Sequence, residues 1–369
     1  MKRLFSLILV FFILVPMAYS QYKYEFKIIK ENPATPVKDQ AQTGTCWCFA
    51  TCSFLESELI RAGKGVHNLS EMYIVRENYV RRINDNYIRR GKGNISQGSV
   101  AHMCTWIMDR YGLLPQEVYG GIKYDSKTHN HNNLVKYVES ISKTALEIGK
   151  RVPDEIINGV LDAYLGEVPN KFVYRGIEYT PKTFYTSTGL KADNYVEITS
   201  FTHHPFYEQI PVEVPDNWDN AKMYNLPLDE MIKVMDNAIN NGYTIVWDGD
   251  VSENGYAFNH SIALNTKEPI KGYKQFEKRI KEIPVTQKSR QDGFENFSTT
   301  DDHLEHITGI AKDQEGTIYY KTKNSWGENS NKDGGYHYMS LEYIKAKTIS
   351  IMVNKNSIPK DIREKLGIK

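Results

Sequence analysis

Apolar residues recur with the period of an α-helix in several segments of the chain. In the first segment, Cys48, Cys52, Leu55 and Leu59 fall at positions i, i+4, i+7 and i+11, which is one face of a helix. This helix is predicted to begin at Cys46, and Gly63 offers its C-terminal stop. The same period predicts further helices over residues 96–111, 134–148, 154–165 and 228–240.

Shorter apolar runs between turn residues predict strands. Residues 243–251 have the composition of a buried strand, and 306–311 and 317–327 are predicted to pair as a hairpin across a charged turn. Residues 170–215 are predicted to form strands and turns, residues 76–93 an exposed loop, and residues 265–300 a charged loop whose helical piece is 278–283.

The first 20 residues have a short basic start, an apolar run, and small residues at Ala18 and Ser20. This pattern predicts a secretory signal peptide cleaved before Gln21, and therefore an exported, periplasmic or secreted protein with no membrane attachment after cleavage. With 46 basic and 45 acidic residues, the charge balance does not favour nucleic acid as a partner. The four cysteines allow at most one disulfide once Cys46 is set aside, and a Cys52–Cys104 bridge is left open.

Cys46 follows a Gly-containing turn and opens the first predicted helix. Unpaired N–H groups and the helix dipole favour negative charge at a helix N-terminus, so we expect them to stabilise a thiolate. Gln40, six residues earlier, can fold back so that its side-chain NH₂ lies beside the Cys46 backbone N–H. Together they would provide two donors for an oxyanion.

A cysteine nucleophile needs a base, and the base needs a group that orients it. His306 lies on the first strand of the predicted hairpin and Asn324 at the end of the second, so the two are expected side by side, with Trp326 shielding their hydrogen bond. His303 and His260 compete for the role. His303 fits the hairpin less well, and His260 has no Asn-Ser-Trp sequence as a partner.

The segment PVKDQAQTGTCWCFA and the NSWG sequence at 324–327 resemble the active-site segments of papain-like cysteine peptidases. QGSVAHMCTWIMDRYGLLPQEVY is similar to the bleomycin hydrolase and aminopeptidase C branch. The resemblance implies a papain-like two-lobed α+β fold over residues 21–369, with a helical lobe carrying Cys46, a β-barrel-like lobe carrying His306 and Asn324, and a helical insertion at about 125–170. It implies catalytic residues Cys46, His306 and Asn324, an oxyanion donor Gln40, and supporting residues Trp47 and Trp326.

This chemistry needs no metal or cofactor, and the expected partner is a peptide or unfolded protein, with a homo-oligomer left open. In the aminopeptidase C branch, a C-terminal arm brings its terminal carboxylate to the substrate's amino group. Here the sequence IMVNKNSIPKDIREKLGIK ends where that arm would begin, so we expect a weaker preference for free N-termini and some endopeptidase activity. Two other hypotheses are an acyltransferase that uses the same residues and a non-catalytic peptide-binding homologue.

Overall fold

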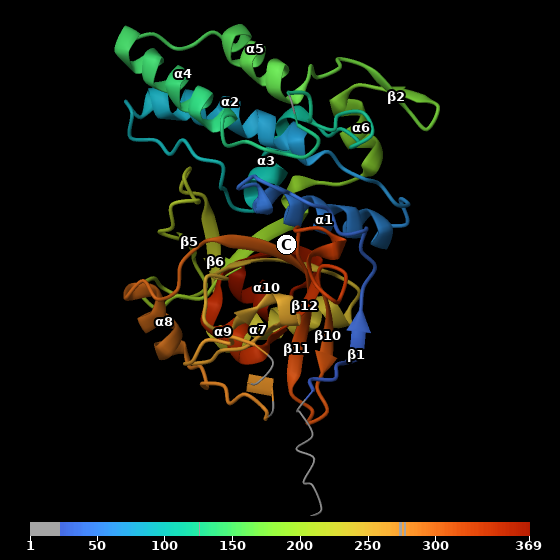
Figure 1. The fold of residues 1–369 in the computed structure, drawn as a ribbon, viewed down its shortest axis with the longest axis vertical. Helices are drawn as coiled ribbons and strands as arrows, with labels where there is room; N and C mark the ends of the chain where they lie inside the picture. Colours follow the sequence, from blue (N-terminus) through green and yellow to red (C-terminus); the bar gives the residue numbers. More distant parts are fainter. Residues whose placement is uncertain (1–22, 125, 273–274, 277) are drawn as a thin grey trace, which may run out of the picture.

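The computed structural model describes residues 23–369 except 125, 273–274 and 277, so the predicted signal peptide lies outside the described residues. A group of helices stands above a large β-sheet, and α1 lies between the two (Figure 1). The helices are α1 (Cys46–Arg61), α2 (Glu71–Ile88), α3 (His102–Tyr111), α4 (Leu134–Ile148), α5 (Asp154–Leu165), α6 (Pro181–Thr188), α7 (Leu228–Asn240), α8 (Gln287–Glu295), α9 (Leu341–Lys347) and α10 (Lys360–Leu366).

The sheet that carries the hairpin runs in the order β5-β6-β4-β13-β7-β10-β11-β12-β9-β8, and β1 pairs with β10 outside this path. Its end strands in this order, β5 and β8, are not paired with each other among the described strands, so the lobe that was expected to be β-barrel-like is an open sheet. The strands are β1 (Lys27–Glu31), β2 (Phe172–Tyr174), β3 (Ile177–Tyr179), β4 (Tyr195–Thr199), β5 (Gln209–Pro211), β6 (Lys222–Asn225), β7 (Ile245–Gly249), β8 (Tyr256–Ala257), β9 (Ile262–Ala263), β10 (His303–Lys312), β11 (Ile318–Lys323), β12 (Tyr336–Ser340) and β13 (Thr348–Asn354), of which β2 and β3 form a separate hairpin.

Alternate residues of the central strands pack into different cores on the two faces of the sheet. Leu304 of β10 and Val246 of β7 belong to the core that includes the buried face of α1. Ile307 of β10 and Trp247 of β7, which face the other way, belong to the core beneath α7 and α10. The helix that begins at Cys46 therefore lies on one face of the sheet, and the C-terminal helix lies on the other.

Several predicted elements are confirmed with their bounds. Helices α4, α5 and α7 begin and end at the predicted residues, and α4 and α5 lie farthest from the sheet (Figure 1). Ser70 caps α2 by accepting a hydrogen bond from the backbone N–H of Tyr73. The mixture of helices and sheet confirms the α+β prediction.

Other expectations are wrong. Residues 76–93 were expected to form an exposed loop, but most of them belong to the long helix α2. Its Tyr79, Arg82 and Ile83 are buried, so the many polar residues in this segment hid a helical buried face. The helical piece in 265–300 is α8 and not residues 278–283, and α6 interrupts the predicted strands of 170–215.

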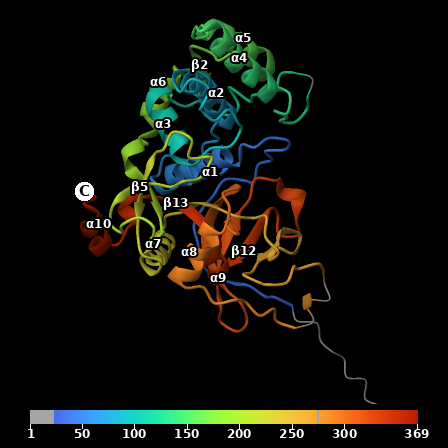
Figure 2. The same cartoon turned by 90° about the vertical axis from the view of Figure 1, so that its left-hand side faces the viewer.

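Helix α10 packs against α7 and ends near the last residue of the chain. Asn237 of α7 donates to the backbone carbonyl of Ser357, and Lys233 pairs with Asp361. Figure 2 shows the C-terminal end at the outer edge of the molecule beside α10. Within the described part of the chain, no helix combines the length and the apolar character that crossing a membrane requires.

Candidate active site

Cys46 is the first residue of α1, as predicted, and the turn before it is tied to the loop that precedes α3. The Gly44 N–H donates to Gln97 Oε1 at 2.9 Å, and the indole N–H of Trp47 donates to the Gln97 carbonyl at 3.0 Å. Trp47 is fully buried, so its side chain packs in the core beside this turn. The loop at Gln97 therefore fixes the turn that precedes Cys46.

Burial opposes the thiolate that the helix position predicts for Cys46. Burial raises the pKa of Cys46 to about 12, a hydrogen bond with the backbone of Leu304 lowers it, and the charges of Asp216 and Asp301 raise it further. This structure therefore favours the neutral thiol. The hydrogen bond with Leu304 also places Cys46 beside the residue that follows His303.

A β-bulge in the β10–β11 hairpin decides which histidine lies beside Asn324. Near the turn, Lys312 pairs with Ile318 and Ile310 with Tyr320. Continued without change, this register would pair His306 with Asn324, as the sequence analysis assumed. The register shifts between Ile307 and Gly309, so that His306 pairs with Lys323.

The shift by one residue turns His306 away from Asn324 and brings His303 to it. His303 Nε2–H donates to Asn324 Oδ1 at 2.9 Å, and the expected His306–Asn324 hydrogen bond is wrong. Asn324 Oδ1 also accepts from the Ser325 N–H at 2.7 Å. The ring centroids of Trp326 and His303 lie 4.9 Å apart. Trp326 is therefore next to the hydrogen bond of Asn324 with His303, and not with His306 as the sequence predicted.

His306 lies in the protein interior beneath α1. It is fully buried, its Nδ1 is 2.8 Å from Ser53 Oγ, and its Nε2 has no partner among the described residues. Burial and the neighbouring Lys323 hold the pKa of His306 well below its usual range. A neutral histidine enclosed between α1 and the sheet and bonded to Ser53 has the environment of a packing residue.

Asn324 is held from its other side by a buried polar chain that the sequence analysis missed. Asn324 Nδ2 donates to the Tyr256 hydroxyl at 3.0 Å, and that hydroxyl donates to Glu305 Oε1 at 2.5 Å. His337 lies 2.5 Å from the other Glu305 oxygen. Burial alone would raise the pKa of Glu305, but His337, His303 and Tyr256 outweigh it, so this pKa lies below its usual range.

Gln40 reaches the turn before Cys46 as predicted. Its Nε2 donates to the Thr43 carbonyl at 2.7 Å, and its Oε1 accepts from Ser325 Oγ at 2.6 Å. The amide nitrogen carries two hydrogens, so one remains for a ligand. The Ser325 contact fixes the orientation of the amide, and it connects the Asn-Ser-Trp segment to the oxyanion donor that the sequence predicts.

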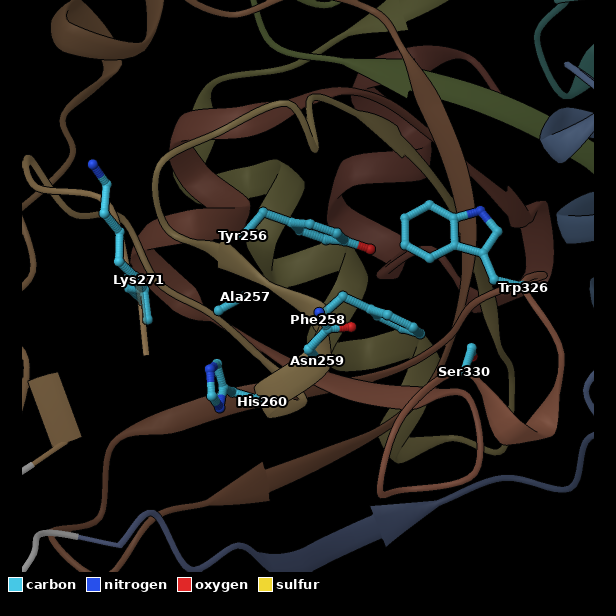
Figure 3. A pocket seen from close by; sticks show the side chains of 9 residues that line it. Tyr256, Ala257, Phe258, Asn259, His260, Lys271, Trp326 and Ser330 are labelled. Atoms are coloured by element: carbon cyan, nitrogen blue, oxygen red, sulfur yellow. The ribbon is translucent and has the colours of Figure 1, made fainter. Parts of the chain in front are cut away.

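Trp326 also borders a cavity of about 500 Å³. Figure 3 shows Trp326 and Phe258 at one end of this cavity and His260 and Lys271 at the other. The Phe258 and Trp326 rings meet edge to face at 4.8 Å. His260, the other rival histidine, lines this cavity, whereas the hydrogen bond to Asn324 comes from His303.

The structure leaves all four cysteines free, so no Cys52–Cys104 bridge forms. Cys48, Cys52 and Cys104 are fully buried, and Cys48 Sγ and Cys52 Sγ lie 4.0 Å apart on the predicted inner face of α1. These three thiols are core residues, whereas Cys46 begins α1 and its thiol contacts the backbone of Leu304, the residue after His303.

Among the described residues, one group of side chains has the spacing of a metal site: His203, His204 and Glu213. Both histidines instead bond to Glu213 through Nε2, at 3.0 and 2.6 Å. Gln291 Oε1 accepts from the Thr202 N–H, which turns its NH₂ toward His203 Nδ1. The proton of His203 is therefore on Nε2, where a metal would need a free electron pair.

The fold is that of papain-like peptidases. PepW from Lactobacillus rhamnosis aligns with a TM-score of 0.68 over 92% of this chain and 84% of its own, at 19% identity. Aminopeptidase C of Lactococcus lactis subsp. cremoris is 24% identical over 88% of this chain and 82% of its own length. Cysteine proteinase 1, mitochondrial, of Saccharomyces cerevisiae is 22% identical over 92% of this chain and 79% of its own.

The model of the peptidase C1-like family matches residues 92–368, and that of the papain family cysteine proteases matches residues 24–158. The chain belongs to the peptidase C1-like family and is a cysteine peptidase. The predicted resemblance to the papain-like peptidases and to aminopeptidase C is confirmed.

Proposed function

We propose that the protein is an exported cysteine peptidase that removes residues from the N-termini of peptides, with Cys46 as nucleophile, His303 as base and Asn324 as the residue that orients His303. The observation that carries the proposal is the 2.9 Å hydrogen bond from His303 Nε2 to Asn324 Oδ1, next to the Leu304 backbone that contacts the Cys46 thiol. With Nε2–H bound to Asn324, His303 Nδ1 is the nitrogen left for the sulfur.

In the proposed reaction, His303 Nδ1 accepts the Cys46 proton as the sulfur attacks the peptide carbonyl. The resulting imidazolium then donates this proton to the leaving amine, and water hydrolyses the thioester. Gln40 Nε2 and the Cys46 N–H stabilise the oxyanion, where the loss of one such donor costs about 3 kcal/mol of transition-state stabilisation. Ser325 keeps the Gln40 amide in place for this role.

Support for the aminopeptidase mode comes from the relatives called aminopeptidase C, which align over most of this chain. Support for export comes from the charge and hydropathy pattern of residues 1–20. Export is tested by expressing the chain with and without these residues and measuring the fraction outside the cytoplasm.

The test of the chemistry is Cys46→Ala, read with one peptide that has a free N-terminus and the same peptide acetylated. We expect the variant to melt like the wild type and to release no product by mass spectrometry, since Cys46 begins its helix at the edge of the core. Cys52→Ala, which changes a buried thiol of the same helix, is the control and should keep turnover. Turnover in purified Cys46→Ala would overturn the nucleophile assignment. An acylated amine in place of the free acid would identify an acyltransferase.

A further inference from the structure

Glu305 is a buried carboxylate that no step of the proposed mechanism uses. It lies two residues after His303 on β10, so the two side chains leave the same face of the strand. Its side chain is inaccessible to solvent, and its Oε1 is 3.7 Å from His303 Nε2. The charge of Glu305 therefore lies beside the ring that accepts the Cys46 proton in the proposed reaction.

No basic side chain cancels this charge. In the described part of the chain, neither a lysine nor an arginine pairs with Glu305, whose partners are His303, Tyr256 of β8 and His337 of β12. His337 donates from Nε2 to Glu305 Oε2 at 2.5 Å, and its Nδ1 is buried without a partner among the described residues. A second proton on this ring would have no acceptor there, which favours the neutral ring and leaves the charge of Glu305 in place.

The ionised state of Glu305 fixes the direction of a chain of hydrogen bonds that ends at His303. Burial would raise the pKa of Glu305, but the charges and hydrogen bonds of its partners hold this pKa below its usual range. An ionised carboxylate only accepts, so the Tyr256 hydroxyl donates to it and keeps its oxygen for Asn324 Nδ2 at 3.0 Å. Asn324 Oδ1 then faces His303 Nε2–H at 2.9 Å. The proton of His303 is thereby placed on Nε2, and Nδ1 is left for Cys46.

Aromatic rings enclose this chain of hydrogen bonds. The Tyr256 ring meets Trp326 edge to face at 6.2 Å and His337 at 5.2 Å, and it stacks with Phe258 at 6.3 Å. Figure 3 shows the Tyr256 hydroxyl directed toward Trp326. Because these rings keep water from the chain, the charge of Glu305 acts on its neighbours more strongly than a surface charge would.

We propose that Glu305 is a positioning residue of the peptidase site, which holds the His303 proton on Nε2 and stabilises the His303 imidazolium by its charge. Tyr256 and Asn324 transmit the first effect, and the 3.7 Å approach produces the second. The inference rests on the proposed function and adds to it. The proton still moves from Cys46 Sγ to His303 Nδ1, and Glu305 stays ionised throughout.

The test is the pH profile of kcat/KM for one peptide with a free N-terminus. Activity is lost at high pH when the imidazolium gives up its proton, so the high-pH limb of the profile reports the charge that acts on His303. In Glu305→Gln this limb should move to lower pH by about 1–3 pH units, the effect of losing an opposite charge at this distance. KM should change little, since Glu305 does not touch the substrate. A limb that coincides with that of the wild type would overturn the charge role.

Asp313→Asn is the matched control. Asp313 is a buried carboxylate that follows the far end of β10, and it accepts from the Tyr319 hydroxyl at 3.3 Å, as Glu305 accepts from Tyr256. Its removal changes the charge of the protein by the same amount but at the turn of the hairpin. The high-pH limb should therefore stay where it is in the wild type, and an equal shift in both variants would contradict a local effect of Glu305.

Tyr256→Phe separates orientation from charge and keeps the ring in its aromatic surroundings. It removes the acceptor of Asn324 Nδ2 but leaves the Glu305 charge, so kcat should fall by about 5-fold, the value of one hydrogen bond, with no shift of the high-pH limb to lower pH. Added to Asn324→Ala, the same substitution should lower kcat little further, which a general loss of stability would not produce. If Glu305→Gln gives no folded protein, Tyr256→Phe decides, because an unchanged kcat would overturn the proposal.

Failure of the proposed function has a different signature. NMR of the His303 ring in Cys46→Ala follows its titration without any turnover. The ring should lose its proton at lower pH when Glu305→Gln is added to Cys46→Ala. If it does so and the wild type cleaves no peptide, the peptidase proposal fails while the charge effect of Glu305 stands. If the ring titrates at the same pH in both proteins, the charge effect is overturned whether or not the wild type is a peptidase.

Discussion

The two histidines of β10 offer a direct test of the hairpin register. Replacing His303 by alanine removes the ring that lies 2.9 Å from Asn324 Oδ1, but this oxygen keeps its 2.7 Å bond from the Ser325 N–H. The free energy of unfolding should therefore fall by only about 1 kcal/mol, the value of one hydrogen bond. Loss of a general acid–base group should lower kcat by about 10²–10⁴-fold.

His306→Ala should give the opposite result. The side chain is fully buried and bonded to Ser53, so its removal leaves a cavity between α1 and the sheet and costs about 2–4 kcal/mol of stability. Ser53 Oγ keeps its 2.7 Å bond from Lys323, and nothing at Asn324 changes. The kcat of the folded variant should stay within a few fold of wild type.

Urea unfolding gives the stability of both variants, and peptide release by the purified, folded fraction gives kcat. The comparison is decisive because the two substitutions are chemically identical and lie three residues apart on one strand. A stable but inactive His306→Ala protein, together with an active His303→Ala protein, would refute the assignment of His303.

Two further predictions follow from other contacts of the site and of the helical lobe. Ser325→Ala removes the 2.6 Å bond that orients the Gln40 amide, so kcat should fall by about 10-fold with little change in melting temperature. In the double variant with Gln40→Ala, the loss of Ser325 should lower kcat little further. Full additivity of the two losses would show that Ser325 acts elsewhere. Burial and, to a smaller extent, His129 lower the pKa of His131 to about 3. The folded state therefore binds this proton less well than the unfolded state, so stability is lost as the pH falls below about 6.5. Lowering the pH from 7 to 5 should reduce the free energy of unfolding by about 2 kcal/mol through His131. In His131→Gln, where the glutamine lies beside the Tyr79 hydroxyl, urea titrations at the two pH values should show a reduction smaller by that amount. An equal reduction in both proteins would contradict His131 as the cause.

Helical periodicity predicted much of the fold because it depends on local spacing. Cys48 and Cys52 of α1 are both fully buried, and helices such as α4 have the predicted bounds. The pattern failed in α2, where Arg82 and Asn86 occupy inward positions that normally belong to apolar residues. Arg82 is tolerated there because its guanidinium donates to the carbonyls of Asn94 and Gly98. Such contacts between distant loops leave no periodic signal.

The histidine was misassigned because a hairpin register depends on every residue between the turn and the site. One signal was present in the sequence: Gly309 interrupts an otherwise apolar strand, and an isolated glycine there suggests a bulge or a close backbone approach. Both occur, since the register shifts beside Gly309 and a Cβ there would collide with the Lys30 carbonyl of β1. A shift of one residue moves every following side chain to the other face of the sheet.

The charge state of Cys46 shows how two physical effects compare at one atom. The field of a helix N-terminus contributes about 0.3–1 kcal/mol, or about 2 kcal/mol in partly buried sites. A pKa raised from 9.0 to about 12 corresponds to about 4 kcal/mol against the thiolate, so burial and the two aspartates outweigh the helix.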